Sequence, residues 1–159
     1  MSCLRISAGV FSFIGFALLL AALASEFWVQ GQLHMGLWKV CLNGLPCNLF
    51  GMDVPDYIHA TRAFMLMAAV AGAVSFFGLC FLSCCSHPKS MVKVSAIASF
   101  IAGLCALIAM ATFTGVYSEQ YQRIFRTWYD WSLGVGWGSI PFFLLAGVLA
   151  SKVQTVTVI

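Results

Sequence analysis

The chain has 159 residues, of which 62% are apolar and only 8% are charged. A soluble domain carries roughly 25% charged residues, so the composition excludes a soluble fold and indicates an integral membrane protein of one domain. The formal net charge is +3, and the eight basic residues are scattered rather than clustered. This distribution argues against nucleic acid as a partner and leaves the lipid bilayer as the expected one.

Four segments lack charged side chains and approach the roughly 20 residues that a helix needs to cross a bilayer. They cover approximately residues 6–25, 63–82, 94–117 and 133–151. Each is expected to be helical, because lipid offers no other partner for backbone N–H and C=O groups. The sequence therefore predicts an all-α transmembrane four-helix bundle over residues 1–159, with outer loops at about 26–62 and 118–132.

The first segment has an alternative interpretation. Arg5, the apolar run after it and the triplet Ala22-Leu23-Ala24 are also typical of a cleaved signal peptide. The apolar run is longer than the roughly 7–15 residues of a signal peptide, which favours a retained first helix.

The first outer loop contains the stretch MGLWKVCLNGLPC, in which Cys41 and Cys47 flank an Asn-Gly pair. Asn-Gly is a strong tight-turn signal, and a turn there brings two cysteines toward disulfide range. Upstream, residues 38–42 alternate between apolar and other side chains, as a half-buried strand does. We predict a β-hairpin closed by a Cys41–Cys47 disulfide, with two free, packed thiols as the alternative.

Orientation follows from the cysteines. The basic residues divide four against four between the two sides of the predicted bundle, so the positive-inside rule does not decide. Disulfides persist in oxidising compartments, which places the hairpin outside the cell or in a lumen and both termini in the cytosol. We expect a multi-pass protein of the plasma membrane.

Two cysteines, Cys84 and Cys85, end the second segment on its cytosolic side. Juxtamembrane cysteines are candidates for S-palmitoylation, and unmodified thiols are the alternative. Cys3 is a weaker candidate of the same kind. Cys80 and Cys105 lie within segments and are expected to be packing residues.

The second outer loop carries aromatic residues at helical spacing, namely Tyr117, Tyr121, Phe125 and Trp128. The third helix is therefore expected to continue beyond the bilayer and to present an aromatic face. Tyr121, Phe125 and Trp128 form either a contact surface for another molecule or a face packed on the protein's own loops.

The fourth segment and the tail carry two further patterns. Gly134 and Gly138 form a G-x-x-x-G pattern, which permits close helix approach within the bundle or between protomers of a homo-oligomer. Pro141 is expected to kink this helix. The last residues, Thr157, Val158 and Ile159, suit the groove of a PDZ domain, where a peptide adds as an edge strand.

Several first-loop residues together form the pattern W…GLW…C…C…R: Trp28, Gly36, Leu37, Trp38, Cys41, Cys47 and Arg62. This pattern in a four-span frame resembles the claudin superfamily. The segments 59–65 and 129–132, and Gly136-Trp137, are most similar to the branch of peripheral myelin protein, epithelial membrane protein and lens fibre membrane intrinsic protein. The first loop has no Asn-x-Ser/Thr glycosylation signal, which many members of this branch carry.

The resemblance implies a four-helix bundle with a small extracellular β-sheet built mainly from the first loop. It implies that Arg62 hydrogen-bonds loop carbonyls or a loop acid such as Glu26, Asp53 or Asp56, with a reach to lipid headgroups as the alternative. Trp28 and Trp38 are expected to anchor the loop at the membrane surface or to hold the sheet on the bundle.

The predicted function is that of a non-enzymatic structural protein of cell–cell contacts or junctions. An accessory subunit that controls the trafficking of another membrane protein shares every one of these features. A paracellular channel is less well supported, because the loop charges are few and mixed in sign. No grouping of side chains predicts catalysis, a metal or a cofactor.

Overall fold

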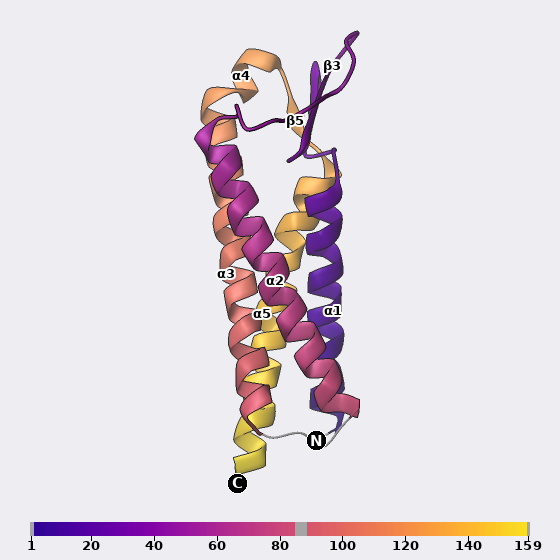
Figure 1. The fold of residues 1–159 in the computed structure, drawn as a ribbon, viewed down its shortest axis with the longest axis vertical. Helices are drawn as coiled ribbons and strands as arrows, with labels where there is room; N and C mark the ends of the chain where they lie inside the picture. The colour runs from indigo at the N-terminus through magenta and orange to yellow at the C-terminus, as the bar shows by residue number, and fades with distance from the viewer. Residues whose placement is uncertain (1, 85–88, 159) are drawn as a thin grey trace.

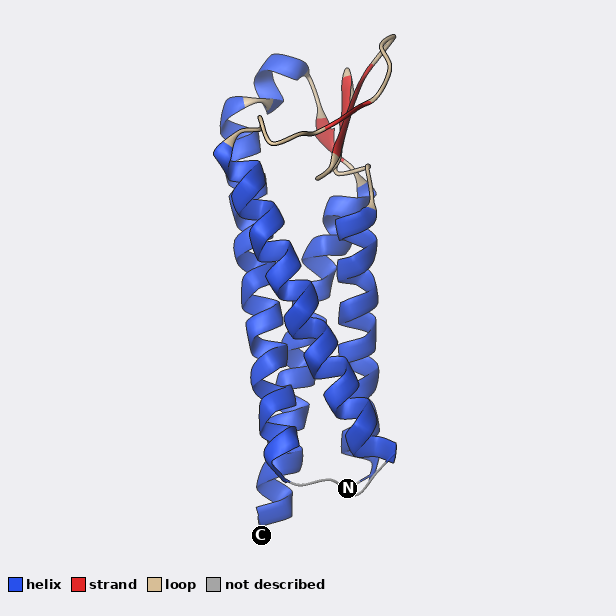
Figure 2. Cartoon of the chain, viewed as in Figure 1, coloured by secondary structure: helices blue, strands red, loops and turns tan. Residues whose placement is uncertain are grey.

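The computed structural model describes residues 2–84 and 89–158, and four long helices dominate it (Figures 1 and 2). A short helix and five short strands lie between them at one end. The helices are α1 (Ser2–Ala24), α2 (Asp56–Cys84), α3 (Lys89–Gln120), α4 (Gln122–Phe125) and α5 (Trp131–Val158).

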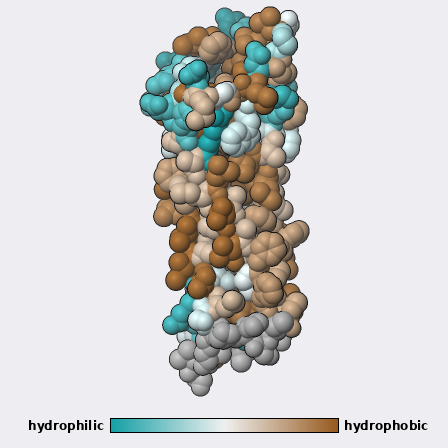
Figure 3. Space-filling view, in the orientation of Figure 1, coloured by the Kyte–Doolittle hydropathy of each residue, from teal (hydrophilic) through white to brown (hydrophobic). Residues whose placement is uncertain are grey.

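The four long helices form a closed ring in which α1 contacts α2, α2 contacts α3, α3 contacts α5 and α5 contacts α1. All four are long and apolar enough to cross a membrane. Figure 3 shows the matching surface, apolar along the bundle and hydrophilic mainly at the end that carries the strands. The start of α1 and the end of α5 both lie at the end of the bundle away from the strands (Figure 1). The predicted four-span bundle is thus confirmed.

The helices extend past the predicted spans at all their ends except the C-terminal end of α1. The clearest case is α2, which begins at Asp56 rather than near residue 63, so Arg62 lies in its second turn. The predicted spans include only the uncharged stretches. A helix, however, makes its own backbone hydrogen bonds both inside the membrane and beyond its surface, so it can continue past the last uncharged residue. The helix α5 continues through Pro141 without a break.

The strands form one antiparallel sheet in the order β4-β3-β2-β1-β5. Their bounds are Val29–Gln30 for β1, Leu33–Met35 for β2, Lys39–Leu42 for β3, Asn48–Leu49 for β4 and Trp128–Tyr129 for β5. Four strands come from the first loop, as expected. The fifth comes from the second loop and pairs with β1, with Val29 opposite Tyr129.

This fifth strand changes the expected aromatic helix face. Trp128 lies on β5, not on a continuation of α3. The helical spacing ends at Arg126, which takes a left-handed conformation with φ of 45° and terminates α4. A left-handed residue turns the chain out of the helix, so the sequence period of the aromatics does not extend to Trp128.

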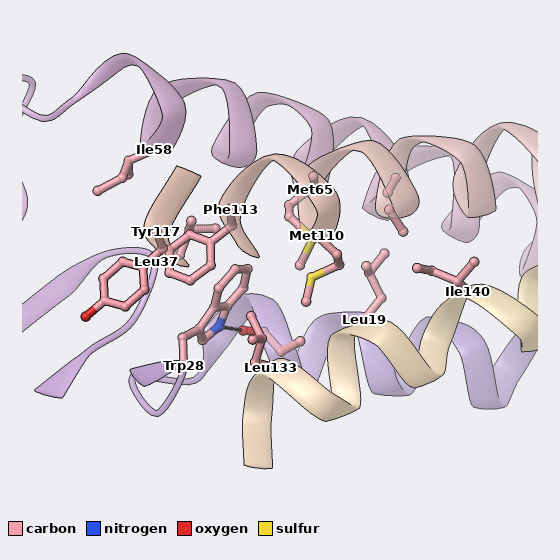
Figure 4. Packing of buried hydrophobic residues seen from close by; sticks show 14 of the residues in the cluster. Leu19, Trp28, Leu37, Ile58, Met65, Met110, Phe113, Tyr117, Leu133 and Ile140 are labelled. Carbon is pink, nitrogen blue, oxygen red and sulfur yellow. Dashed lines mark hydrogen bonds between the residues drawn. The ribbon is translucent and has the colours of Figure 1, made fainter. Parts of the chain in front are cut away.

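The buried core runs from the sheet into the bundle (Figure 4). At the sheet end, Trp28 and Leu37 from the first loop pack with Met65, Met110 and Phe113 from the helices. A second buried cluster at the far end contains Ala8, Leu79, Leu82, Val92, Ala96, Ala150 and Val153. Sheet and bundle therefore share one core, and the sheet is not a separate unit.

Small and polar side chains bring the helices together inside the bundle. Ser12 Oγ lies 3.0 Å from Ser75 Oγ, and Ser75 is in turn hydrogen-bonded to Ser99. Because these buried hydroxyls are hydrogen-bonded to one another, the cost of their desolvation is offset, and they join α1, α2 and α3. Among the described residues, nothing lies within 4 Å of a Cβ placed at Gly134 or Gly138. The G-x-x-x-G pattern is therefore not a packing face within this chain.

Candidate functional site

The hairpin in the first loop has the predicted disulfide, which joins Cys41 at the end of β3 to Cys47 before β4. Their Cα atoms are 4.2 Å apart. The turn between them is closed by a hydrogen bond from Leu45 N to Leu42 O, and Gly44 has a φ of +88° that favours glycine. No residue of β3 is fully buried, so the expected alternation of burial is absent here. The hairpin forms the outer edge of the sheet and leaves both of its faces partly open.

Two tryptophans of the loop bind the last turn of α1. The Trp28 indole N–H donates to Ala22 O at 2.7 Å, and the Trp38 indole N–H donates to Leu23 O at 2.9 Å. These carbonyls belong to the end of α1, where no intrahelical donor is available. Trp28 is completely buried and lies edge-on against Phe113 at 4.8 Å (Figure 4). The two indoles therefore fix the root of the sheet to the bundle, and only the Trp38 ring is partly exposed.

Arg62 connects α2 to the same loop. Its Nε donates to Leu37 O at 3.0 Å, and its terminal nitrogens lie 3.4 Å from Gly51 O and 3.5 Å from Phe50 O. The guanidinium also stacks over the Trp38 ring, with 4.8 Å from Cζ to the ring centroid. One buried side chain thus holds the backbone on both sides of the disulfide hairpin.

One of the three loop acids considered for Arg62 has a different partner. Glu26 forms an ion pair with Lys39, with 2.8 Å between Oε1 and Nζ. Both side chains are partly exposed to solvent, so the pair contributes little to stability. The structure places carbonyls, and not this carboxylate, around Arg62.

The GLW triplet occupies a close crossing of the chain. A Cβ on Gly36 would lie 2.6 Å from Glu26 Cα and 2.7 Å from Ser25 O. Only glycine permits the backbones to approach so closely. The next residue, Leu37, is fully buried and supplies the carbonyl that Arg62 binds. The triplet therefore combines a backbone crossing, a core side chain and an indole anchor in three consecutive positions.

The aromatic face of α3 and α4 points toward the protein's own sheet. Phe113, Tyr117, Tyr121 and Phe125 stack in sequence, with ring centroids 5.6, 5.9 and 6.4 Å apart. A cavity of about 190 Å³ lies between Tyr121 and Phe125 on one side and the sheet on the other. Tyr121 and Phe125 are half-buried there, whereas Trp128 is exposed.

The second loop is held by hydroxyl groups that the sequence did not single out. Tyr117 Oη lies 2.7 Å from Thr127 Oγ1, and Tyr129 Oη donates to Thr114 O at 3.0 Å. Burial raises the pKa of the Tyr129 phenol above its usual value. A Cβ on Gly31 would clash with Arg126 O at 2.8 Å, so this glycine admits β5 beside β1. No sequence spacing signals this contact, because its two sides are far apart in the chain.

Three apolar side chains at the open edge of the sheet are strongly exposed. Leu45 is 65% exposed, Leu49 is 77% exposed and Met52 is 83% exposed. Leu45 lies in the turn between β3 and β4, Leu49 lies on β4, and Met52 lies in the segment between β4 and α2. We call these three residues the hairpin tip. Its position separates it from the apolar surface of the helices, which lipid covers.

The opposite end carries the remaining candidate residues. Cys84 is exposed at the end of α2, whereas Cys85 lies outside the described residues. S-palmitoylation of either remains a prediction. Thr157 and Val158 are in the last turn of α5, and Ile159 lies outside the described residues. PDZ binding also remains a prediction, and it requires this last turn to unwind into a strand.

Comparison with known proteins gives the chain a family. Residues 1–150 match the model of the PMP-22/EMP/MP20/Claudin family. Lens fiber membrane intrinsic protein of Homo sapiens is 33% identical over 150 residues, which cover 86% of this chain and 83% of the relative. Protein NKG7 of Mus musculus is 32% identical over 145 residues, with the same coverage of both chains. The chain belongs to the PMP-22/EMP/MP20/Claudin family, a family of non-enzymatic membrane proteins.

Proposed function

We propose that this protein is a structural tetraspan protein of cell–cell contacts in the plasma membrane. The sheet faces the cell exterior, both termini face the cytosol, and the hairpin tip is the contact surface. The observation that carries the proposal is an exposed apolar edge on a sheet whose hairpin is closed by a disulfide and which two indoles and a buried arginine fix to the bundle.

The disulfide supports this orientation. A Cys41–Cys47 bond persists in an oxidising compartment, which is the cell exterior or a lumen. All five acidic residues (Glu26, Asp53, Asp56, Glu119 and Asp130) belong to the sheet end. Acidic residues weigh little in the positive-inside rule, so the disulfide carries the argument.

The chemistry of the hairpin tip supports a protein partner. Leu45, Leu49 and Met52 are all strongly exposed within one stretch of the first loop, and exposed apolar patches are typical of interaction surfaces. Transferring one exposed leucine or methionine into an interface is favourable by about 1.5–3 kcal/mol. The tip is also pre-organised, because the hairpin is cross-linked and Arg62 binds the backbone at Phe50 and Gly51. Little conformational entropy is then lost on contact.

A mixed-cell assay tests the proposal. Two cell populations, each expressing the chain with a different fluorescent label, are mixed, and the enrichment of both labels at shared boundaries is measured. We expect enrichment for the native chain and its loss in a Leu49→Ser, Met52→Ser double variant with unchanged surface delivery. Asn48→Ser is the matched control, since Asn48 is exposed on the same strand but is not apolar. Enrichment of the double variant equal to that of the control would contradict the contact surface.

A second candidate function is that of an accessory subunit for another membrane protein. It is favoured by the open face at Gly134 and Gly138, which this chain does not use for its own packing. Small residues on a lipid-facing helix allow a partner helix to approach closely. Isolation from native membrane with a stoichiometric partner that is lost in Gly138→Leu, but retained in the hairpin-tip variant, would favour this function over the first.

A further inference from the structure

At the end of the bundle opposite the sheet, Arg5 lies over the second buried cluster. It is half-buried in the first turns of α1. Its side chain lines a cavity of about 10 Å³ together with five apolar residues from the other three long helices: Leu79, Leu82, Val92, Ala150 and Val153. Arg5 thus lies against apolar side chains at this end of the bundle.

The Nε atom of Arg5 is buried and has no hydrogen-bond partner among the described residues. A buried, unpartnered donor of a charged group is unfavourable, and such groups normally have an acceptor. The cavity is barely large enough for one water molecule, which needs two to four polar partners. Every side chain lining the cavity other than Arg5 is apolar, so a water there would be poorly held.

No aspartate or glutamate side chain is available to pair with Arg5 in the helix segments at this end. The stretches 1–25, 57–118 and 131–158 contain no Asp or Glu. Lys93 and Lys152 are instead exposed, and in the sequence they directly neighbour the lining residues Val92 and Val153. Among the side chains that the structure describes at this end, Arg5, Lys93 and Lys152 are cationic, and no Asp or Glu of the helices there neutralises them.

We infer that Arg5, with the exposed Lys93 and Lys152 on helices at the same end of the bundle, is a binding site for the phosphate group of an anionic lipid headgroup. The guanidinium presents Nε–H and a terminal N–H as a planar fork, which matches two phosphate oxygens. Its position at the end of a membrane-spanning helix places it at headgroup depth, and the two lysines add attraction for a net negative lipid. Binding turns the guanidinium outward and gives Nε its acceptor, while the aliphatic stem remains on the apolar cluster.

This site is independent of the hairpin tip, because it lies at the other end of the bundle. It gives the protein a preference for one class of lipid around its helix ends. Inorganic phosphate offers the same oxygens without acyl chains, so the two sources of phosphate are separable by experiment.

The test uses the full chain, purified in detergent and analysed by native mass spectrometry after addition of phosphatidylserine, phosphatidylcholine or inorganic phosphate. We expect phosphatidylserine adducts to exceed phosphatidylcholine adducts, and inorganic phosphate to give no stable adduct. Arg5→Gln should weaken the phosphatidylserine adduct by about tenfold, the factor expected for one charge-assisted hydrogen bond. Arg5→Lys should retain part of the binding, since it keeps the charge and loses the fork.

Arg123→Gln is the matched control, because Arg123 is exposed at the sheet end. It should bind phosphatidylserine as the native chain does. The helical circular dichroism of each variant shows that it is folded. Equal phosphatidylserine adducts in folded Arg5→Gln and Arg123→Gln would overturn the site, as would equal adducts of the two lipids on the native chain. Inorganic phosphate adducts that Arg5→Gln abolishes would show a free-anion site in place of a lipid site.

Discussion

Replacing Arg62 by lysine should weaken the attachment of the first loop to α2 while leaving the helices intact. The guanidinium makes one short bond, from Nε to Leu37 O at 3.0 Å, and two long ones to Gly51 O and Phe50 O. It also stacks on Trp38. A lysine keeps the charge but has no fork and can satisfy only part of this set.

The magnitude follows from these contacts. A hydrogen bond to a charged group contributes about 1.5–3 kcal/mol, and bonds at 3.4 and 3.5 Å contribute much less. A cation–π contact adds about 0.5–2 kcal/mol. Allowing for the one bond that lysine can replace, what is lost is the cation–π contact and the two weak bonds, so Arg62→Lys should lower the free energy of unfolding by about 0.5–2 kcal/mol.

Reversible denaturation in detergent micelles, followed by tryptophan fluorescence, measures this change, because Trp38 contacts the guanidinium. Arg123→Lys serves as the control, since Arg123 is exposed. Helical circular dichroism should be the same in both variants. The interpretation of Arg62 as the connection between α2 and the loop is refuted if the two variants unfold at the same denaturant concentration.

Three further predictions concern the same region. Cys41→Ser should destabilise the sheet by about 2–3 kcal/mol and impair surface delivery, whereas Cys80→Ser should do neither; equal behaviour of the two would contradict a structural role of the disulfide. Gly36→Ala should greatly reduce the yield of folded protein, because its Cβ meets backbone at 2.6 Å, whereas Gly51→Ala, with nothing within 4 Å, should be tolerated. Burial raises the pKa of the Tyr129 phenol in the folded protein. The protonated phenol therefore contributes stability that is fully present below the pKa of about 10 in the unfolded chain, and this stability is lost as the pH rises through the pKa in the folded chain. The free energy of unfolding of Tyr129→Phe should therefore fall less steeply with rising alkaline pH than that of the native chain. An equal dependence on pH in the two proteins would argue against the buried phenol.

The bundle was predictable because it depends on composition over long windows. Uncharged stretches of bilayer length have few alternatives to a helix, and an Asn-Gly pair between two cysteines has few alternatives to a closed hairpin. Helix ends were not predictable to the same degree. A charge does not stop a helix at the membrane surface, and α2 accordingly starts at Asp56.

Contacts between segments that are far apart in the chain could not be predicted from the spacing of residues in the sequence. The spacing of Tyr121, Phe125 and Trp128 suggested one helical face, but the left-handed Arg126 sends Trp128 into a strand beside β1. Likewise, nothing local distinguishes Gly136, whose Cβ would meet Met110 Cε at 2.8 Å, from Gly134, whose Cβ would meet nothing. Which glycine faces a neighbour is decided by how α5 is rotated against α3.

The orientation of the sheet is the central claim, and cysteine labelling measures it directly. Ile124→Cys places a thiol on α4 at a position that is 69% exposed, and Lys152→Cys places one near the opposite end of the bundle. Intact cells expressing each variant are treated with a membrane-impermeant maleimide, before and after permeabilisation. We predict that Ile124→Cys is labelled above the native chain on intact cells, whereas Lys152→Cys gains label only after permeabilisation. Labelling of Lys152→Cys on intact cells, with Ile124→Cys silent, would contradict the account.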